Sequence, residues 1–235
     1  MNDIPVRLHI AAFVKTPGLS PVKTRLAAGV GEAAALTFFN LACAATQAVL
    51  KETERLAPGG IVAHWAVAEA AGLAQWASLR VLAQGEGGLG ARLDHVYRAL
   101  AGPGVAPVLI GADAPQITAA TFLDVRAAFA AGHDFVLGPA TDGGFYLFAG
   151  ARPIPTEVWT EVSYSVATTA DELARRLAPW GRLAWLAPLT DVDQTVDLPA
   201  LLAQLAQLTA PLPAQQELAA WIKARLKAGL ASSGP

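Results

Sequence analysis

Short apolar runs that end in Gly, Pro or Asp alternate along this chain with longer Ala- and Leu-rich segments of helical period. The short runs predict strands, and the longer segments predict the crossover helices that join strands of a parallel sheet. The expected strands are residues 7–14, 61–67, 79–83, 107–110, 134–137, 145–148 and 183–186. The expected helices are residues 31–50, 89–100, 119–131, 168–177, 198–208 and 213–228. The chain is therefore predicted to be an α/β protein.

Several of the expected strands, such as Val-Leu-Ile-Gly and Phe-Val-Leu-Gly, are apolar throughout. Strands of this kind are expected when helices cover both faces of the sheet. Ligands of such sheets bind beyond the carboxyl ends of the strands. The polar residues that follow each strand are therefore the candidates for function.

Composition narrows the classes of partner. The 235 residues include 17 Lys and Arg against 19 Asp and Glu, which leaves no basic surplus for nucleic acid. The single Cys43 excludes a disulfide framework and a thiolate zinc site. No uninterrupted apolar run reaches the roughly 18–20 residues of a membrane span, and the first residues lack a signal-peptide pattern. We expect a soluble cytoplasmic protein without a membrane span, and the oligomeric state stays open.

The first candidate segment is the loop 15–26, which follows the first expected strand. Lys15, Lys23, Thr24 and Arg25 lie there beside Gly and Pro. Lys and Arg suit phosphate oxygens, and the helix that follows would add its positive amino end. The segment is not a Walker A loop, because that motif needs Gly directly before its Lys. A solvated basic turn is the alternative.

The second segment, 84–93, is rich in Gly and opens an expected helix. Gly85, Gly87 and Gly90 satisfy the GxGxxG pattern, and Arg92 follows them. Alone, this pattern is typical of dinucleotide binding, but here it follows an interior strand instead of the first strand–helix unit. Phosphate binding, NAD or flavin binding and a purely structural turn all stay open.

The third segment places Asp113 directly after a buried strand, with Pro115 stopping that strand. A carboxylate at this edge without a basic neighbour in sequence suits Mg²⁺ or Mn²⁺. The alternative is an Asp that caps the following helix.

The fourth segment carries Asp142 before the pair Gly143 and Gly144. Two adjacent glycines allow the backbone to come close to a ligand. A hairpin turn without further purpose competes with that interpretation, because Asp-Gly is a common turn signal.

A fifth acidic stretch lies near the C-terminus. Asp191 and Asp193 fall on the same side of an extended segment and could share a divalent ion, or form a solvated acidic turn. Asp197 is expected to cap the next helix.

Together these segments resemble a family of small, mostly uncharacterised bacterial proteins with a glycosyltransferase-A-like, or nucleotide-diphospho-sugar transferase, fold. The matching stretches are FVKTPGLSPVKTRLA, QGEGGLGARL, GADAPQIT, LGPATDGGFYLFA and PLTDVDQTVDL. The family is distantly related to nucleotidyltransferases of cofactor biosynthesis. The resemblance spans residues 6 to about 200 and implies a Rossmann-like three-layer sandwich with a mixed, mostly parallel central sheet. The domain is expected to cover 1–210, with an amphipathic helix in 211–235 packed on it.

The resemblance also implies roles for individual residues. Lys23 and Arg25 match phosphate-binding residues, Asp113 matches a metal-binding acid, and Asp142 and Gly143 match part of a sugar or acceptor pocket. Asp191 and Asp193 match an acidic motif of the family. The chain departs from the family pattern beside Asp113, at Ala112 and Ala114, and in the segment 162–165.

The leading functional hypothesis is therefore glycosyl transfer from a nucleotide-diphosphate sugar to a small-molecule acceptor. Mg²⁺ or Mn²⁺ held by Asp113 and Asp193 would assist, with Lys23 and Arg25 on the diphosphate and Asp142 as the base. The alternatives are nucleotidyl transfer from an NTP to a phosphorylated small molecule, and a non-catalytic nucleotide-binding module.

Overall fold

The computed structural model describes residues 6–232 and contains a seven-stranded sheet. The strands are β1 (Arg7–Val14), β2 (Ile61–Val67), β3 (Arg80–Ala83), β4 (Val105–Gly111), β5 (Phe135–Pro139), β6 (Phe145–Gly150) and β7 (Leu183–Trp185). The helices are α1 (Thr24–Val30), α2 (Glu32–Leu56), α3 (Leu89–Leu100), α4 (Ala119–Ala130), α5 (Thr156–Thr160), α6 (Thr169–Leu177), α7 (Leu198–Ala206) and α8 (Pro213–Ser232). Two short 3-10 helices, η1 (Ala70–Trp76) and η2 (Thr195–Asp197), complete the elements.

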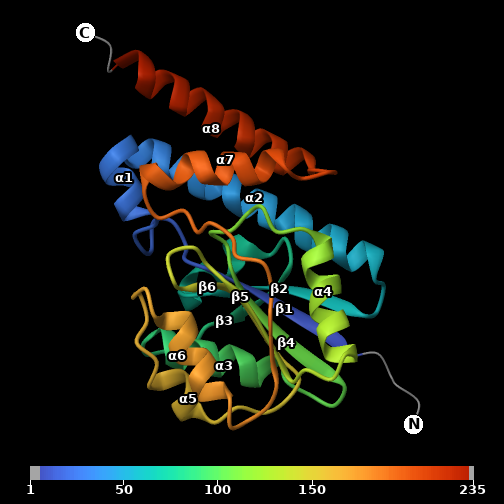
Figure 1. Ribbon diagram of the computed structural model, residues 1–235. Helices are drawn as coiled ribbons and strands as arrows, with labels where there is room; N and C mark the ends of the chain where they lie inside the picture. Colours follow the sequence, from blue (N-terminus) through green and yellow to red (C-terminus); the bar gives the residue numbers. More distant parts are fainter. Residues whose placement is uncertain (1–5, 233–235) are drawn as a thin grey trace.

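The sheet has the strand order β3-β2-β1-β4-β6-β5-β7. Only β6 among these strands runs antiparallel to its neighbours, β4 and β5, and every other pair is parallel. Helices cover both faces of the sheet, with α3, α5 and α6 on one side and α2, α4 and the α7–α8 pair on the other (Figure 1). The mixed, mostly parallel α/β sandwich is thus confirmed.

This topology brings distant segments to one edge of the sheet. Strands β1, β4, β5 and β7 all run in the same direction, because β5 and β4 are each antiparallel to β6. The loops after β1 and β4, the β5–β6 hairpin and the segment after β7 therefore meet at the carboxyl edge. Strands β2 and β4 lie on opposite sides of β1, and a crevice at such a switch point is where α/β sheets bind ligands.

The expected elements are all present, with bounds that agree to within a few residues except that α2 extends to Leu56. Four further elements were not predicted from the sequence pattern, namely α1, α5, η1 and η2. All are seven residues or fewer, which is too short for a helical period to show in the sequence. Lys23, Thr24 and Arg25 consequently lie at the start of α1 instead of within a loop. The Gly-rich segment follows β3, which is an edge strand and not the interior strand that we expected.

Helix α8 packs on α2 and α7 through a cluster in which Leu218 and Ile222 are fully buried. The buried Gln215 at its start donates hydrogen bonds of 2.9 Å to the backbone carbonyls of Pro115 and Ile117. The helix is therefore tied to the segment that follows β4. The division of the chain into a domain of residues 1–210 and a separate C-terminal segment, 211–235, stays a prediction.

Helix α2 is long and apolar enough, by length and composition, to cross a membrane. Its polar residues interrupt every apolar run, so the sequence analysis did not single it out. Within the structure 56% of its most apolar window is buried. Phe39 and Cys43 pack toward the sheet, and Phe38 packs toward α8, which accounts for its apolar surface on both sides.

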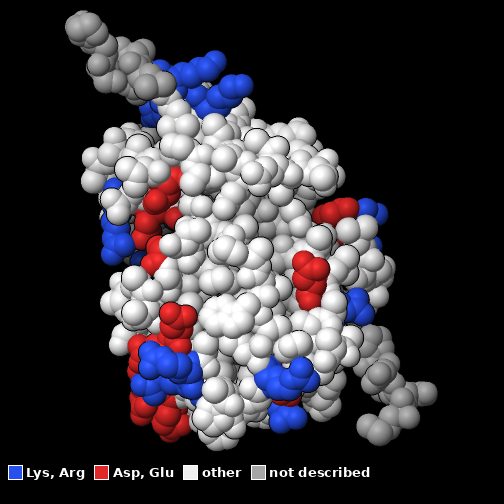
Figure 2. Space-filling model, in the orientation of Figure 1, with Lys and Arg blue, Asp and Glu red and all other residues white. Residues whose placement is uncertain are grey.

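Charged side chains are sparse on the surface. One face of the molecule is largely uncharged, and most of its groups of Lys and Arg lie beside acidic atoms (Figure 2). This face offers no continuous basic surface of the kind that tracks a nucleic-acid backbone.

Two neighbouring histidines on β1 and β2 predict an acid-sensitive fold. His9 and His64 have ring centroids 5.6 Å apart, and His64 Nδ1 lies 3.3 Å from the carbonyl of Ile10. Burial, followed by nearby arginines for His9, lowers the pKa of both below the ordinary value of 6.5.

Because the folded-state pKa is depressed, the folded state binds fewer protons than the unfolded chain, so stability is full above pH 6.5 and is lost as the pH falls. Between pH 7.5 and pH 5.5 the unmodified protein should lose unfolding free energy as these histidines bind protons. The double variant His9→Gln, His64→Gln should lose about 1 kcal/mol less over the same range. Urea unfolding at the two pH values measures this loss. An equal loss in the variant would contradict the assignment.

Candidate active site at the carboxyl edge of the sheet

Two cavities open side by side at the carboxyl edge. The first, which we call the cationic cavity, measures about 400 Å³. It is lined by the ends of β1 and β4, by residues 15–25 between β1 and the first turn of α1, and by Gln84. The second, which we call the apolar cavity, measures about 420 Å³ and is lined by β4, the β5–β6 hairpin, residues 164–169 and the segment after β7. Both are lined by Arg25 and Asp193, so these two residues lie between the cavities.

Lys23 sits at the centre of the polar network. Its side chain is only 4% exposed, and its Nζ lies 2.9 Å from Asp113 Oδ1 and donates a hydrogen bond to the carbonyl of Val192. Burial alone would lower the pKa of Lys23, but Asp113, Asp191 and Asp193 together raise it. The residue adopts φ 49°, a left-handed conformation that is uncommon outside glycine and typical of functional sites. The charged ammonium therefore joins α1, β4 and the segment after β7.

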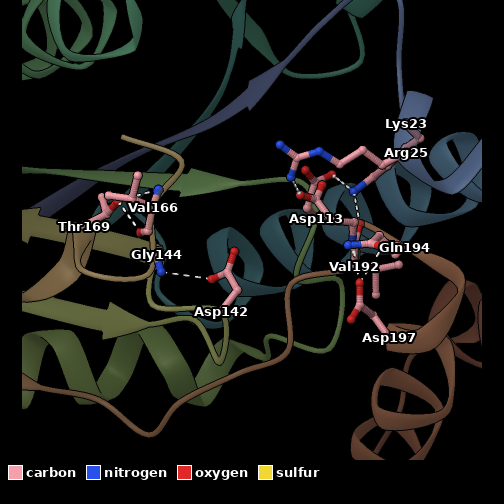
Figure 3. A network of polar contacts seen from close by, with 11 residues as sticks. Lys23, Arg25, Asp113, Asp142, Gly144, Val166, Thr169, Val192, Gln194 and Asp197 are labelled. Carbon is pink, nitrogen blue, oxygen red and sulfur yellow. Dashed lines mark hydrogen bonds and ion pairs between the residues drawn. The ribbon is translucent and has the colours of Figure 1, made fainter. Parts of the chain in front are cut away.

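A second ion pair lies closer to solvent. Arg25 Nη1 contacts Asp193 Oδ2 at 2.7 Å, with side chains 65% and 43% exposed. Figure 3 shows Lys23 and Arg25 reaching from α1 toward the acidic residues. The expected phosphate-binding cations, Lys23 and Arg25, thus pair with the expected metal-binding acids, Asp113 and Asp193. Sequence reasoning placed Asp113 without a basic partner, and the fold supplies Lys23 from a distant segment.

Asp191 completes the acidic group. Its Oδ1 is buried and accepts no hydrogen bond. Burial and, after it, the charge of Asp113 raise the pKa of Asp191 to about 7, while Lys23 opposes the shift. An unpartnered buried carboxylate oxygen is costly, so this atom is suited to a cation.

The carboxylates can be tested against the divalent cation expected from the sequence. Within residues 6–232, no three acidic, His or Cys side chains are gathered closely enough to hold a metal ion by themselves. Asp113 Oδ1 and Asp193 Oδ2 each join an ion pair, so a second oxygen of each carboxylate can face a cation, and Asp191 adds its buried Oδ1. Mg²⁺ is usually bound by one or two carboxylates and completed by phosphates and water. The donor set therefore fits a cation that arrives with a diphosphate.

Asp142 stands apart from this network, on the β5–β6 hairpin (Figure 3). Its Oδ1 accepts a hydrogen bond of 2.9 Å from the backbone N–H of Gly144, which fixes the carboxylate at the wall of the apolar cavity. Gly143 has φ 90°, and a Cβ there would lie 2.0 Å from the carbonyl oxygen of Ala167. This glycine therefore brings the hairpin against residues 164–169. The hairpin turn itself forms part of the cavity wall, so the segment is both a turn and a surface that a ligand can contact.

The Gly-rich segment does not reach either cavity with the residues that we expected. Arg92 Nε donates to the carbonyl of Gly87 at 3.0 Å, and its guanidinium lies 3.4 Å from Gln84 Oε1. A Cβ at Gly90 would lie 2.3 Å from the carbonyl oxygen of Trp159, so this glycine allows α3 to pack on α5. None of the three lines the cavities, and their expected contact with phosphate has no support in the geometry.

The remaining predicted residues fall as follows. Lys15 and Thr24 line the cationic cavity, and Asp191 and Gly144 line the apolar one. Asp197 occupies the N-cap position of α7, as predicted, but its side chain makes no capping hydrogen bond there. Its Oδ2 accepts the backbone N–H groups of Asp193 and Gln194 instead. It thereby shapes the turn that presents Asp193.

Sequence reasoning missed several lining residues. Gln84 is buried at the cationic cavity, where its amide nitrogen donates to the carbonyls of Val14 and Ala66. Tyr164, Ser165 and Val166 line the apolar cavity. Their segment has no strand or helix pattern, and the signal that pointed to it was the departure from the family pattern at 162–165. Ser165 has φ 62°, a second left-handed residue at the site.

The two ion pairs predict unequal contributions to stability. Lys23→Met leaves Asp113 and its acidic neighbours without a counter-charge, so it should lower the unfolding free energy by roughly 2–3 kcal/mol, less than for a fully buried pair because Asp113 is 40% exposed. Arg25→Ala removes an exposed pair and should cost at most about 1 kcal/mol. Urea unfolding of both variants at pH 7.5 measures the difference.

A double variant serves as the control. Adding Asp113→Asn to Lys23→Met should recover part of the lost stability, because the unpaired charge is then removed. Equal losses in the two single variants, or no recovery in the double variant, would contradict a central role for the Lys23 ammonium.

A solved structure shares this fold over nearly its whole length. A protein of Desulfovibrio desulfuricans G20, provisionally described as a nucleotide-diphospho-sugar transferase, matches with a TM-score of 0.76 and 22% sequence identity, covering 93% of this chain and 97% of that one. The likeness shows that the chain has the fold of the nucleotide-diphospho-sugar transferase type.

Weaker likenesses extend to two further proteins. A CMP:2-keto-3-deoxy-manno-octonic acid synthetase complexed with CTP matches with a TM-score of 0.47 and 13% identity, over 86% of this chain and 99% of that one. Rv0371c of Mycobacterium tuberculosis H37Rv, in complex with manganese, matches with a TM-score of 0.42 and 17% identity, over 83% and 97%. Neither is close enough to carry an argument about the site.

At the level of sequence, residues 44–166 match the model of a family described as uncharacterized proteins conserved in bacteria, DUF2064. No curated protein matches the chain.

Proposed function

The chain belongs to the DUF2064 family of bacterial proteins, and from the architecture of its site we propose that it is a glycosyltransferase that uses a nucleotide-diphosphate sugar. The observation that carries the proposal is the pair of cavities that meet at Arg25 and Asp193. One cavity offers cations for a diphosphate, and the other offers a fixed carboxylate, Asp142, for an acceptor. A transferase needs two such places within reach of each other.

The cationic cavity would bind the donor. Lys15, Lys23 and Arg25 line it, and guanidinium and ammonium groups bind phosphate oxygens through charge-assisted hydrogen bonds. Arg25 is exposed and paired with a single carboxylate, so it can turn to the diphosphate at small cost. Lys23 is held more firmly and would orient Asp113 as well as contribute charge.

Asp142 would act at the acceptor. The Gly144 N–H holds one carboxylate oxygen, and the other can accept the proton of an acceptor hydroxyl. The acceptor oxygen then forms its bond to the anomeric carbon as the bond from that carbon to the diphosphate oxygen breaks. The proton goes to Asp142, and the electron pair leaves with the nucleoside diphosphate.

Asp113 and Asp193 are the residues that would hold Mg²⁺ or Mn²⁺, together with phosphate oxygens of the donor. When bound, the cation would supply neutralisation of the charge that develops on the departing diphosphate.

Nucleotidyl transfer is the second candidate. It is favoured by one observation, that all three cations of the site line a single cavity, as a triphosphate would require. In that reaction an NTP would lose pyrophosphate when a phosphorylated acceptor attacks its α-phosphate.

Nucleotide binding provides the test that separates these candidates. Isothermal titration with UDP, GDP, CDP and ADP, each with MgCl₂ or MnCl₂, should show one or more of the diphosphates binding, more weakly after chelation of the metal. Sugar transfer or hydrolysis from the corresponding nucleotide sugar should follow. Pyrophosphate release from an NTP without a sugar donor would favour the second candidate, and tight binding without turnover on any donor would favour a non-catalytic module.

The variant Asp142→Asn tests whether this residue is the general base of the reaction. Loss of the proton acceptor should lower kcat by about 10²–10⁴-fold, while the affinity for the nucleoside diphosphate stays within about twofold, because Asp142 lies away from the cationic cavity. Asp171→Asn, an exposed carboxylate on α6, is the matched control and should keep full activity. Full turnover by Asp142→Asn would remove this residue from the mechanism.

A further inference from the structure

The two cavities differ in the charges on their walls. Three cations and two carboxylates line the cationic cavity. Among the described residues that line the apolar cavity, the charged ones are Arg25, Asp142, Asp191 and Asp193. The acceptor side of the site is therefore acidic.

Arg25 does not offset this acidity for a ligand. Its guanidinium is bound to Asp193 at 2.7 Å, and on the proposed function it is needed by the diphosphate of the donor. A phosphorylated acceptor in the apolar cavity would face the Asp142 carboxylate without a cation of its own. Such an anion would lose its hydration and meet like charge, which strongly disfavours its binding.

Apolar side chains make up much of the remaining wall, which also includes Ser165 and Thr169. The apolar ones include Leu89, Leu93, Leu109, Phe145 and Val166. The wall also includes two tyrosines whose hydroxyls are used elsewhere: Tyr146 donates to the carbonyl of Ala187 at 3.1 Å, and Tyr164 donates to that of Trp159 at 2.9 Å.

These tyrosines therefore offer the ligand ring surface in place of free hydroxyls. Pockets with an apolar wall and a few placed polar groups bind small molecules that have an apolar body.

Resting on the proposed function, we infer that the acceptor is an uncharged or cationic small molecule with an apolar body, such as an aromatic or aliphatic alcohol or amine, and not a phosphorylated one. Its hydroxyl would lie at Asp142 and its apolar body against Leu93 and Phe145. This acceptor class also separates the two candidate reactions, because nucleotidyl transfer of the kind described requires a phosphorylated acceptor.

Three probes that share one ring test the inference. They are 2-phenylethanol, 2-phenylethylamine and phenyl phosphate, titrated by saturation-transfer NMR with excess inorganic pyrophosphate present to fill the cationic cavity. The alcohol and the amine should bind in the millimolar range, the amine more tightly. Phenyl phosphate should bind at least about tenfold more weakly than the amine, because its charge has the sign of Asp142.

A matched pair of variants locates the binding. Val166→Lys puts a cation on the wall of the apolar cavity, and Val196→Lys puts the same cation on η2, where the valine is 77% exposed and lines neither cavity. Val166→Lys should strengthen phenyl phosphate binding and weaken amine binding, each by about tenfold. Val196→Lys should bind all three probes as the unmodified protein does.

Three results would overturn the inference: phenyl phosphate binding as tightly as the alcohol, no binding of the alcohol or the amine, or identical behaviour of the two valine variants. The nucleoside diphosphate titrations are independent of these results. Diphosphate binding with a preference for phenyl phosphate would contradict the acceptor class alone, and the expected probe order without diphosphate binding would contradict the donor alone.

Discussion

The site is organised around one buried ammonium group. Lys23 lies at the amino end of α1, yet its Nζ contacts Asp113 after β4 and the Val192 carbonyl in the segment after β7. Three acidic side chains could not remain so close together without this charge, because each would raise the pKa of the others. Asp191, whose Oδ1 has no hydrogen-bond partner, keeps a raised pKa even with Lys23 present, first because it is buried and second because Asp113 is near. The arrangement is therefore preset for a ligand that brings additional positive charge near the carboxylates.

The fold class, and the place of the candidate site at the carboxyl edge of the sheet, were predictable from the sequence because both depend on local patterns. The apolar strands, the helical periods between them and the polar residues after each strand are all visible in single segments, and β6 was the one reversal that only the resemblance implied. The ion pairs were not predictable in this way. Lys23 and Asp113 lie in different segments of the chain. No local pattern indicates that α1 is short or that Lys23 has a left-handed backbone conformation, and both features accompany the contact.

Contacts between distant segments, which local patterns do not reveal, also explain why the phosphate contact expected for the Gly-rich segment has no support in the geometry. Its pattern is the one that a dinucleotide site would use, but Gly90 is needed for the approach of α3 to Trp159, and Arg92 serves the turn itself. A glycine pattern reports that two backbones come close, without saying whether the second backbone belongs to a ligand or to the protein. Tyr164 and Val166 were not predicted as site residues, because their irregular segment carries no recognisable sequence pattern.

Gln215 gives the C-terminal helix a role beyond covering the core. Its amide nitrogen holds the carbonyls of Pro115 and Ile117, so α8 braces the turn that directly follows Asp113. The part of the chain recognised as DUF2064 ends at residue 166, well before this brace. Relatives that differ only in their tails can thus differ in the stiffness of the acidic edge.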